Sequence, residues 1–178
     1  EPTWGEEHCL QDHYIYLSNT SGVKVGITRH TQLPTRWIDQ GAVQALAVIK
    51  VTKRYYSGLI ETAFKEYLND KTNWRSMLKN DYSEVNLLEV FQTVWPQVEA
   101  QLDNELLNDL SVIAESEQQI DISYPALRYP EKINSFNLDK NPVIEDTLIA
   151  IKGQYLIFEQ GVINIRKYAG YEVTLEIL

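Results

Sequence analysis

Tyr16, Arg36 and Glu61 are side chains of the types that hydrolysis of a phosphodiester requires. That reaction needs an activated water, neutralisation of charge on the phosphoryl oxygens and help for the leaving oxygen. Glutamate oxygens bind hard cations such as Mg²⁺ or Mn²⁺, and the planar guanidinium of an arginine clamps a phosphoryl group. The three residues therefore predict a site in which Glu61 holds the metal, Arg36 binds phosphate and Tyr16 takes a proton from water.

A β-hairpin is expected to position the first of these residues. Residues 14–18 and 23–28 alternate as strands do, and the residues between them favour a turn. With the turn centred on residue 20, Tyr16 lies opposite Lys24 and Tyr14 lies opposite Gly26, so all four share one face. A lysine beside the phenol would lower the pKa of Tyr16 from its usual value of about 10. Lys24 is therefore a fourth catalytic candidate, acting on Tyr16 or on phosphate directly.

Helices and one more strand are expected to carry the rest of this module. Pro34 opens a short helix around Arg36, and Gly41 ends it. The apolar run 45–52 predicts a strand covered on both faces, and an apolar stripe predicts a helix over 57–68, which carries Glu61. Residues 72–78 predict a short helix, and residues 84–118 predict acidic helices with an apolar stripe.

The last part of the chain changes to short strands separated by glycines. Strands are expected at 147–151, 154–158, 162–165 and 171–177, with glycine spacing typical of an antiparallel meander or small barrel. The sequence thus predicts an α+β fold: a three-stranded antiparallel sheet flanked by helices, then a small C-terminal antiparallel β-domain. The expected division is a linker or module remnant at 1–13, a first domain at 14–122 and a second at 123–178.

The order of these residues resembles the GIY-YIG endonucleases. Tyr14-Ile15-Tyr16, then Lys24-Val25-Gly26-Ile27-Thr28, Arg36 and Glu61 are similar to that family's two motifs, its arginine and its metal-binding glutamate, over roughly residues 14–79. The resemblance implies a GIY-YIG-like sheet, an Mg-dependent endonuclease and a polar role for Asn73. Lys24 stands where the second motif has a tyrosine, and Tyr14 stands where the first motif has a glycine. Tyr14, Gly26, Arg29 and Asn73 are the substrate-binding candidates.

Longer phrases are similar to a bacterial family of uncharacterised proteins, a domain of unknown function. They are Ser-Gly-Val-Lys-Val-Gly-Ile-Thr-Arg from residue 21 and Pro-Thr-Arg-Trp-Ile-Asp-Gln-Gly-Ala from residue 34. That resemblance implies a cysteine-rich, zinc-binding segment upstream. Cys9 and His13 are four residues apart and either belong to the remnant of such a zinc site or are incidental, since two ligands do not complete a tetrahedral site.

Charge limits the expected partners. The net charge is −9, whereas a non-specific nucleic-acid binder is usually basic. Residues 23–79 nevertheless hold ten basic and four acidic residues, a local charge of +6, which leaves a basic face for DNA or RNA. No apolar run is long enough for a membrane span, so no membrane partner is expected. A single cysteine favours a reducing, cytoplasmic setting.

Each candidate also has a plain structural interpretation. Tyr16 is equally a strand aromatic that packs on a helix, Glu61 pairs with Lys65 at i, i+4, and Arg36 stacks on Trp37. The acidic helices are expected to pack on their own domain, with a protein partner as the alternative. The expected function is a metal-dependent endonuclease. The alternative is a non-catalytic nucleic-acid- or protein-binding module on the same scaffold.

Overall fold

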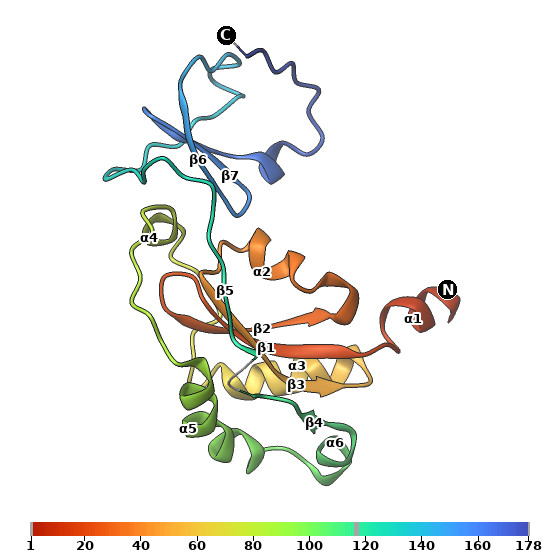
Figure 1. Ribbon diagram of the computed structural model, residues 1–178. Helices are drawn as coiled ribbons and strands as arrows, with labels where there is room; N and C mark the ends of the chain where they lie inside the picture. The colour runs from red at the N-terminus through yellow and green to blue at the C-terminus, as the bar shows by residue number, and fades with distance from the viewer. Residues whose placement is uncertain (1, 116–117, 178) are drawn as a thin grey trace.

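A computed structural model describes residues 2–115 and 118–177 of the chain (Figure 1). It contains helices, short 3₁₀ turns and two antiparallel sheets, which confirms the expected mixture of helices with antiparallel strands. The elements in order are α1 (Pro2–His8), β1 (His13–Asn19), β2 (Val23–Arg29), η1 (His30–Gln32), α2 (Thr35–Asp39), β3 (Gln44–Val51), α3 (Arg54–Phe64), α4 (Trp74–Leu78), α5 (Leu87–Glu99), α6 (Asn104–Asp109), β4 (Ser111–Val112), β5 (Ile120–Asp121), β6 (Leu148–Lys152), β7 (Tyr155–Phe158), β8 (Val162–Asn164) and η3 (Ile165–Tyr168).

The first sheet is larger than the sequence predicted. Its strand order is β2-β1-β3-β4, and β5 also pairs with β3, so five strands replace the expected three. Both additions are two residues long; β4 comes from the segment 84–118 that was expected to be helical, and β5 follows that segment. After Leu110 the backbone becomes extended, with ψ 151°, and the chain returns along β3. The prediction of helix through residue 118 is therefore wrong, because the apolar periodicity of α5 and α6 was extended beyond their caps.

The register of the hairpin differs from the expected one by two residues. Tyr16 pairs with Gly26, Tyr14 with Thr28 and Lys24 with Ser18. The first strand runs one residue further into the turn than the sequence indicated, and the turn is centred on residue 21, which moves the pairing without exchanging faces. Tyr14, Tyr16, Gly26 and Lys24 therefore still share one face, as predicted, but their partners across the hairpin were predicted wrongly.

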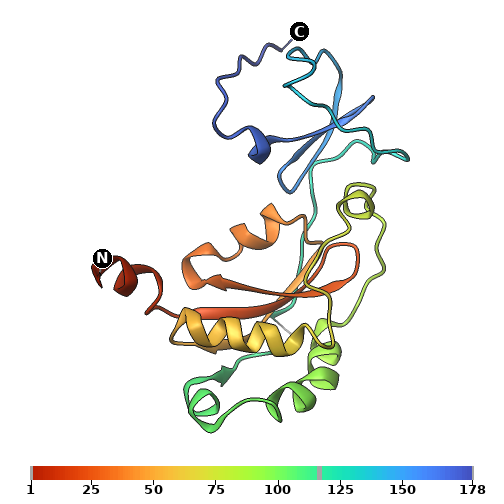
Figure 2. The ribbon, with the colours of Figure 1, turned by 180° about the vertical axis from the view of Figure 1, so that it is seen from behind.

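Helices lie on both faces of this sheet. Figure 2 shows α2 along one side and α3 with α5 along the other. On the α3 side, Ile15, Leu17 and Val25 of the strands pack with Ile60 and Phe64 of the helix. On the α2 side, Tyr16 packs with Trp37 and small side chains of the sheet. The acidic helix α5 also packs inward: its apolar stripe, which includes Phe91 and Val98, joins the larger core.

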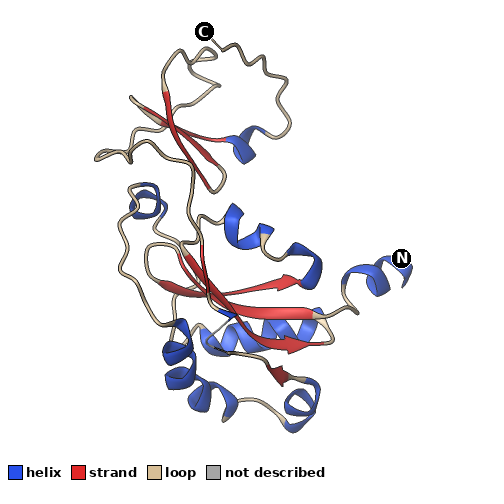
Figure 3. Cartoon of the chain, in the orientation of Figure 1, coloured by secondary structure: helices blue, strands red, loops and turns tan. Residues whose placement is uncertain are grey.

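The second sheet, β6-β7-β8, is a short antiparallel meander (Figure 3). Its core includes Ile149, Ile157 and Val162, and Met77 and Leu78 of α4 pack into the same cluster. The strand expected at 171–177 is not formed: these residues are exposed and have no paired neighbour among the described residues. Alternating apolar side chains predict a strand only where a sheet edge accepts it.

At the N-terminus, a helix occupies much of the expected linker. Trp4 and His8 stack across one turn of α1, with ring centroids 4.6 Å apart. Within the residues that the structure describes, no helix has the length and apolar character needed to cross a membrane.

Phe64 is expected to dominate the contact between α3 and α5. Its ring lies 6.2 Å from those of Phe91 and Trp95, centroid to centroid, and it is fully buried. Phe64→Ala is expected to lower the free energy of unfolding by about 3–5 kcal/mol, measured by urea denaturation. The matched control is Tyr55→Ala on the same helix, where the ring is 70% exposed and the loss should stay within about 0.5 kcal/mol. Equal losses in the two variants would contradict this account of the core.

Candidate functional site

Tyr16 pairs across the hairpin with Gly26, and only a glycine at position 26 leaves room for the Tyr16 ring. Its side chain is fully buried, although it comes from the face of β1 that α2 covers. A Cβ placed on Gly26 would lie 2.5 Å from the Tyr16 hydroxyl oxygen and 2.6 Å from its Cζ. Because real Cβ atoms do not approach that closely, the hydrogen at Gly26 is what lets the ring lie over β2, the edge strand.

Two residues of the α2 segment approach the phenol from above the sheet. The Tyr16 hydroxyl donates a hydrogen bond of 3.1 Å to Oε1 of Gln40, the residue that ends α2. The Trp37 ring meets the Tyr16 ring edge to face at 6.0 Å. Burial raises the pKa of Tyr16 above its ordinary value, and the charge of the neighbouring Arg36 opposes that rise. Arg36 itself remains exposed to solvent, although the phenol is not.

Glu61 comes from α3, on the other side of the sheet from α2. Its negative charge adds to the effect of burial in raising the pKa of Tyr16. One carboxylate oxygen forms an ion pair of 3.3 Å with Lys65, as the i, i+4 spacing predicted. Lys65 also pairs with Asp70 at 3.5 Å, so it bridges the two acids. The Glu61 side chain is 21% exposed, which leaves part of it open to solvent.

Lys24 does not act on Tyr16 as the sequence suggested. It pairs across the hairpin with Ser18, and its ammonium donates to Thr72 Oγ1 at 2.9 Å. Burial, helped by the charge of Arg36, lowers the pKa of Lys24 to about 8. The prediction that Lys24 lowers the pKa of Tyr16 is wrong, since that pKa is raised and the opposing cation is Arg36. Lys24 and Arg36 nevertheless lie close enough to influence each other.

The predicted substrate-binding residues are distributed around this centre. Tyr14 lies two residues before Tyr16 on β1, so the two side chains are on the same face. The centroid of the Tyr14 ring is 5.4 Å from that of the His30 ring. Asn73 caps α4, its Oδ1 accepting from the Ser76 amide at 3.3 Å. Arg29 pairs with His13, which places it on the opposite face of the hairpin from Tyr16. The structure therefore brings Tyr14 to the candidate site but separates Arg29 from it.

Cys9 and His13 gain no third metal ligand among residues 2–115 and 118–177. Among the described residues no group of three or more His, Cys, Asp or Glu side chains has the arrangement of a metal site. Cys9 is a free thiol, and the buried His13 ring uses Nδ1 in a 2.7 Å hydrogen bond with the Gln11 carbonyl. Burial lowers the pKa of His13, so the ring favours its neutral form.

Gln40, Thr72 and Asp70 are neighbours of the site that sequence reasoning missed. Gln40 follows Arg36 by four residues, the spacing that places two side chains on one face of a helix, so a signal for it was present. Thr72 and Asp70 belong to the loop after α3 that runs beside β2, where the Val25 amide donates to the Asn69 carbonyl at 3.0 Å. That pairing is a long-range contact without a local sequence signature.

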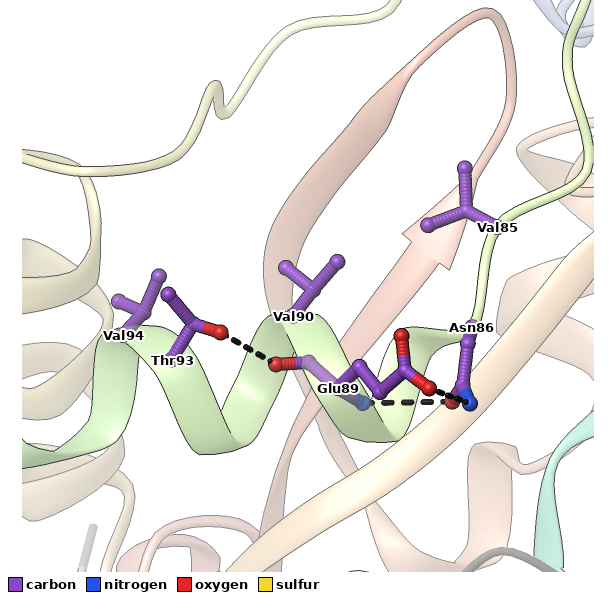
Figure 4. Close-up of a pocket in the computed structure, with 6 residues that line it drawn as sticks. All are labelled: Val85, Asn86, Glu89, Val90, Thr93 and Val94. Carbon is purple, nitrogen blue, oxygen red and sulfur yellow. Dashed lines mark hydrogen bonds between the residues drawn. The ribbon is translucent and has the colours of Figure 1, made fainter.

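A surface hollow on α5 lies apart from these residues (Figure 4). It is lined by Val85, Asn86, Glu89, Val90, Thr93 and Val94. Its polar contacts are those of a helix start: Asn86 accepts from the Glu89 amide at 3.2 Å and donates to the Glu89 carboxylate at 2.9 Å. Helix capping accounts for this arrangement, and it adds nothing to the candidate site.

Gly26→Ala is expected to displace the Tyr16 ring. The added methyl group would overlap the phenol, so the variant should lose about 1–3 kcal/mol of unfolding free energy and shift the ring resonances of Tyr16 in NMR spectra. Gly58→Ala is the matched control, because nothing lies within 4 Å of a Cβ at that helical position and alanine favours helix. A Gly26→Ala variant as stable as the control would contradict the close approach of ring and backbone.

The charge of Arg36 is expected to appear in the titration of Tyr16. The phenol should remain protonated past about pH 10, its ordinary pKa, because burial disfavours the phenolate. Arg36→Gln should raise the pKa of Tyr16 further and also raise that of Lys24, since Arg36 lowers both. NMR titration of the Tyr16 Cζ, assigned by its absence in Tyr16→Phe, measures the first effect. An unchanged midpoint in Arg36→Gln would separate the two side chains.

Comparison with protein families gives one match. A model described as "Protein of unknown function (DUF2797)" matches residues 1–173, so the match includes α1 and both sheets. The comparisons with curated proteins and with solved structures gave no match. The expectation of an uncharacterised domain family is confirmed: this chain belongs to the family DUF2797.

Proposed function

We propose that this chain is a metal-dependent endonuclease whose site resembles that of the GIY-YIG enzymes. The observation that carries the proposal is the shared neighbourhood of Tyr16, Arg36 and Glu61. They come from β1, α2 and α3, and the pKa of the Tyr16 phenol responds to the charges of both other groups. A buried tyrosine whose pKa is shifted by burial and by charges from distant parts of the chain is a candidate for a functional site.

In this proposal Arg36 and Lys24 bind the phosphodiester. Arg36 is exposed, so its guanidinium is available to hold two phosphoryl oxygens. Lys24 is buried and has a pKa of about 8, so it is still mainly protonated near neutral pH and presents a second positive charge. The two cations disfavour each other, and an anion bound between them relieves that repulsion.

Glu61 is the residue that would hold Mg²⁺ or Mn²⁺. Magnesium in phosphoryl-transfer sites keeps several waters and takes only one or two carboxylates together with substrate phosphate, so a single glutamate suits it. Such an ion supplies charge neutralisation and a more acidic bound water. For this role the Glu61 carboxylate must leave Lys65, and Lys65 keeps a partner in Asp70.

In the free protein, the Tyr16 hydroxyl is held in place but is not deprotonated. Its buried hydroxyl is held by Gln40 and remains protonated at neutral pH, because burial raises its pKa. Deprotonation of Tyr16 requires positive charge beyond that of Arg36. We assign to Tyr16 the role of general base: with a cation bound, the phenol would release its proton to solvent, and the resulting phenolate would accept a proton from the attacking water.

A binding module without catalysis is the second candidate. The ion pair between Glu61 and Lys65 favours it, because a carboxylate already paired is less available to a metal. The lysine in place of the second motif tyrosine also favours it, since an ammonium buried at the site binds anions without transferring a proton from water.

Cleavage assays separate the two candidates. Branched, single-stranded and double-stranded DNA and RNA are incubated with Mg²⁺ or Mn²⁺, and the full chain is expected to cut at least one of them. Glu61→Gln should lower kcat/KM by about 10²-fold or more, the scale of losing one preorganised electrostatic contact to the transition state. Glu99→Gln, an exposed carboxylate at the end of α5, is the control and should retain full activity.

Binding to the same substrates completes the test. Anisotropy should show weaker binding by Lys24→Met and Arg36→Gln, with binding retained in Glu61→Gln. Binding that depends on both cations, without cleavage by the full chain, would identify the non-catalytic module. Neither cleavage nor binding would reject both candidates.

A further inference from the structure

A buried lysine joins the second sheet to the first domain. Lys152, at the end of β6, is fully buried, and its ammonium donates a 2.6 Å hydrogen bond to Oδ1 of Asn80. The rings of Tyr82, Tyr124 and Tyr129 surround it, with centroids 5.9, 5.4 and 5.4 Å from the nitrogen. These distances are within cation–π range. Within the described part of the chain it forms no ion pair with a carboxylate, and burial lowers its pKa to about 8.

One wall of this cage is bonded to the end of α2. The Tyr124 hydroxyl lies 3.1 Å from the Ile38 carbonyl oxygen and 2.9 Å from that of Ala42, and it donates to this pair of acceptors. The Ile38 carbonyl also accepts from the Gly41 amide at 2.9 Å, so the Tyr124 hydroxyl adds a further bond to the turn that ends α2. The ring that faces Lys152 is therefore fixed to the residues on either side of Gln40.

The hairpin that carries Lys152 touches the same place. Gly153 has φ +59° in the turn between β6 and β7, and a Cβ there would lie 3.0 Å from the Asp39 carbonyl oxygen and 3.1 Å from the Gly41 nitrogen. The turn thus packs against the backbone of the two neighbours of Gln40. Gln40 is the acceptor of the Tyr16 hydroxyl. Two separate contacts, one from Tyr124 and one from Gly153, therefore bracket the residue that holds the phenol.

We propose that Lys152 is a positioning residue for the Tyr16 site, clamping the second sheet and Tyr124 against the end of α2 so that Gln40 stays on the phenol. As far as catalysis is concerned, this rests on the proposed endonuclease function. The second sheet is then part of the site, although none of its side chains contacts Tyr16 in the structure.

The length of α2 explains why it needs this support. The helix has five residues, and a helix that short has little stability of its own in water. Its position depends on tertiary contacts: Trp37 packs against Tyr16 on one side, and the Lys152 cage holds its final turn. Loss of the clamp leaves the carbonyl end of α2 without the Tyr124 hydroxyl and admits water to the phenol.

The first experiment uses Lys152→Ala, which removes both the ammonium and the stem that fills the cage. The expected results are a pKa of Tyr16 that falls toward its ordinary value of about 10 and faster amide hydrogen exchange at Gly41 and Ala42. With a cleaved substrate, kcat should fall roughly tenfold or more at nearly unchanged KM, since a misplacement of about 1 Å costs up to about 10²-fold. Lys167→Ala is the matched control, a lysine 5.1 Å from the ring of Tyr168 in the same domain.

The second experiment keeps the cage intact. Tyr124→Phe retains the ring that faces Lys152 and removes only the hydroxyl bonded to α2. It should show the same changes at Tyr16, and it tests the proposal even if Lys152→Ala does not fold. Tyr129→Phe is its control, because the Tyr129 hydroxyl has no hydrogen-bond partner among the residues that the structure describes.

The outcomes separate the clamp from the proposed function. Folded Lys152→Ala and Tyr124→Phe variants with an unchanged Tyr16 pKa and unchanged exchange at Gly41 and Ala42 would overturn the clamp, whatever the activity. Changes at Tyr16 in these variants but not in the controls, in a chain that cleaves no substrate, would support the clamp and leave only the endonuclease proposal rejected.

Discussion

The burial of one phenol across the hairpin determines the geometry of the whole candidate site. Tyr16 lies over Gly26 at a distance that no other residue at position 26 permits, and α2 covers it from the other side. The edge strand, the short helix and the loop after α3 are arranged around that ring. The ring is fully buried while Arg36 is exposed, so the guanidinium is accessible to solvent and the phenol is not.

Burial and the charge of Arg36 have opposing effects on the pKa of Tyr16. Burial disfavours charge on both Tyr16 and Lys24, so each is held nearer its neutral form than in water. Arg36 favours the phenolate but disfavours the protonated lysine. An anion bound beside Arg36 would reverse the second effect, and a cation bound at Glu61 would strengthen the first. The free protein is therefore in a state that ligands of both signs would change, which is the expected property of a site for a phosphate and a metal together.

The sequence predicted the elements that carry the candidate residues better than the contacts between those residues. Local patterns predicted that Tyr16 lies on a strand and that Arg36 and Glu61 lie on two later helices. They also predicted which side chains share a face of the hairpin. The register was not, because a shift of two residues preserves every inward-facing side chain and leaves the alternation unchanged. The cage of Lys152 had no local signal, since its tyrosines and Asn80 lie far from it in the sequence. Residues 171–177 do not form the expected strand for a related reason. Alternation predicts which side chains would share a face, but it does not predict a neighbouring strand to pair with.

The acidic charge of the chain and a site for the proposed anionic substrate are compatible because the basic and acidic residues are concentrated in different parts of the sequence. Ten of the basic residues lie between positions 23 and 79, the part that forms the hairpin, α2, α3 and α4. The acidic helices α5 and α6 lie across the sheet from α2, with α3 on their side (Figure 2). Interactions between exposed charges are largely screened beyond about 8 Å at physiological ionic strength. Net charge therefore has little effect on a nucleic acid that is still distant, and Arg36 and Lys24 act on a phosphate only once it is close. Such a protein would depend on local contacts for binding, and its affinity would come from few phosphates.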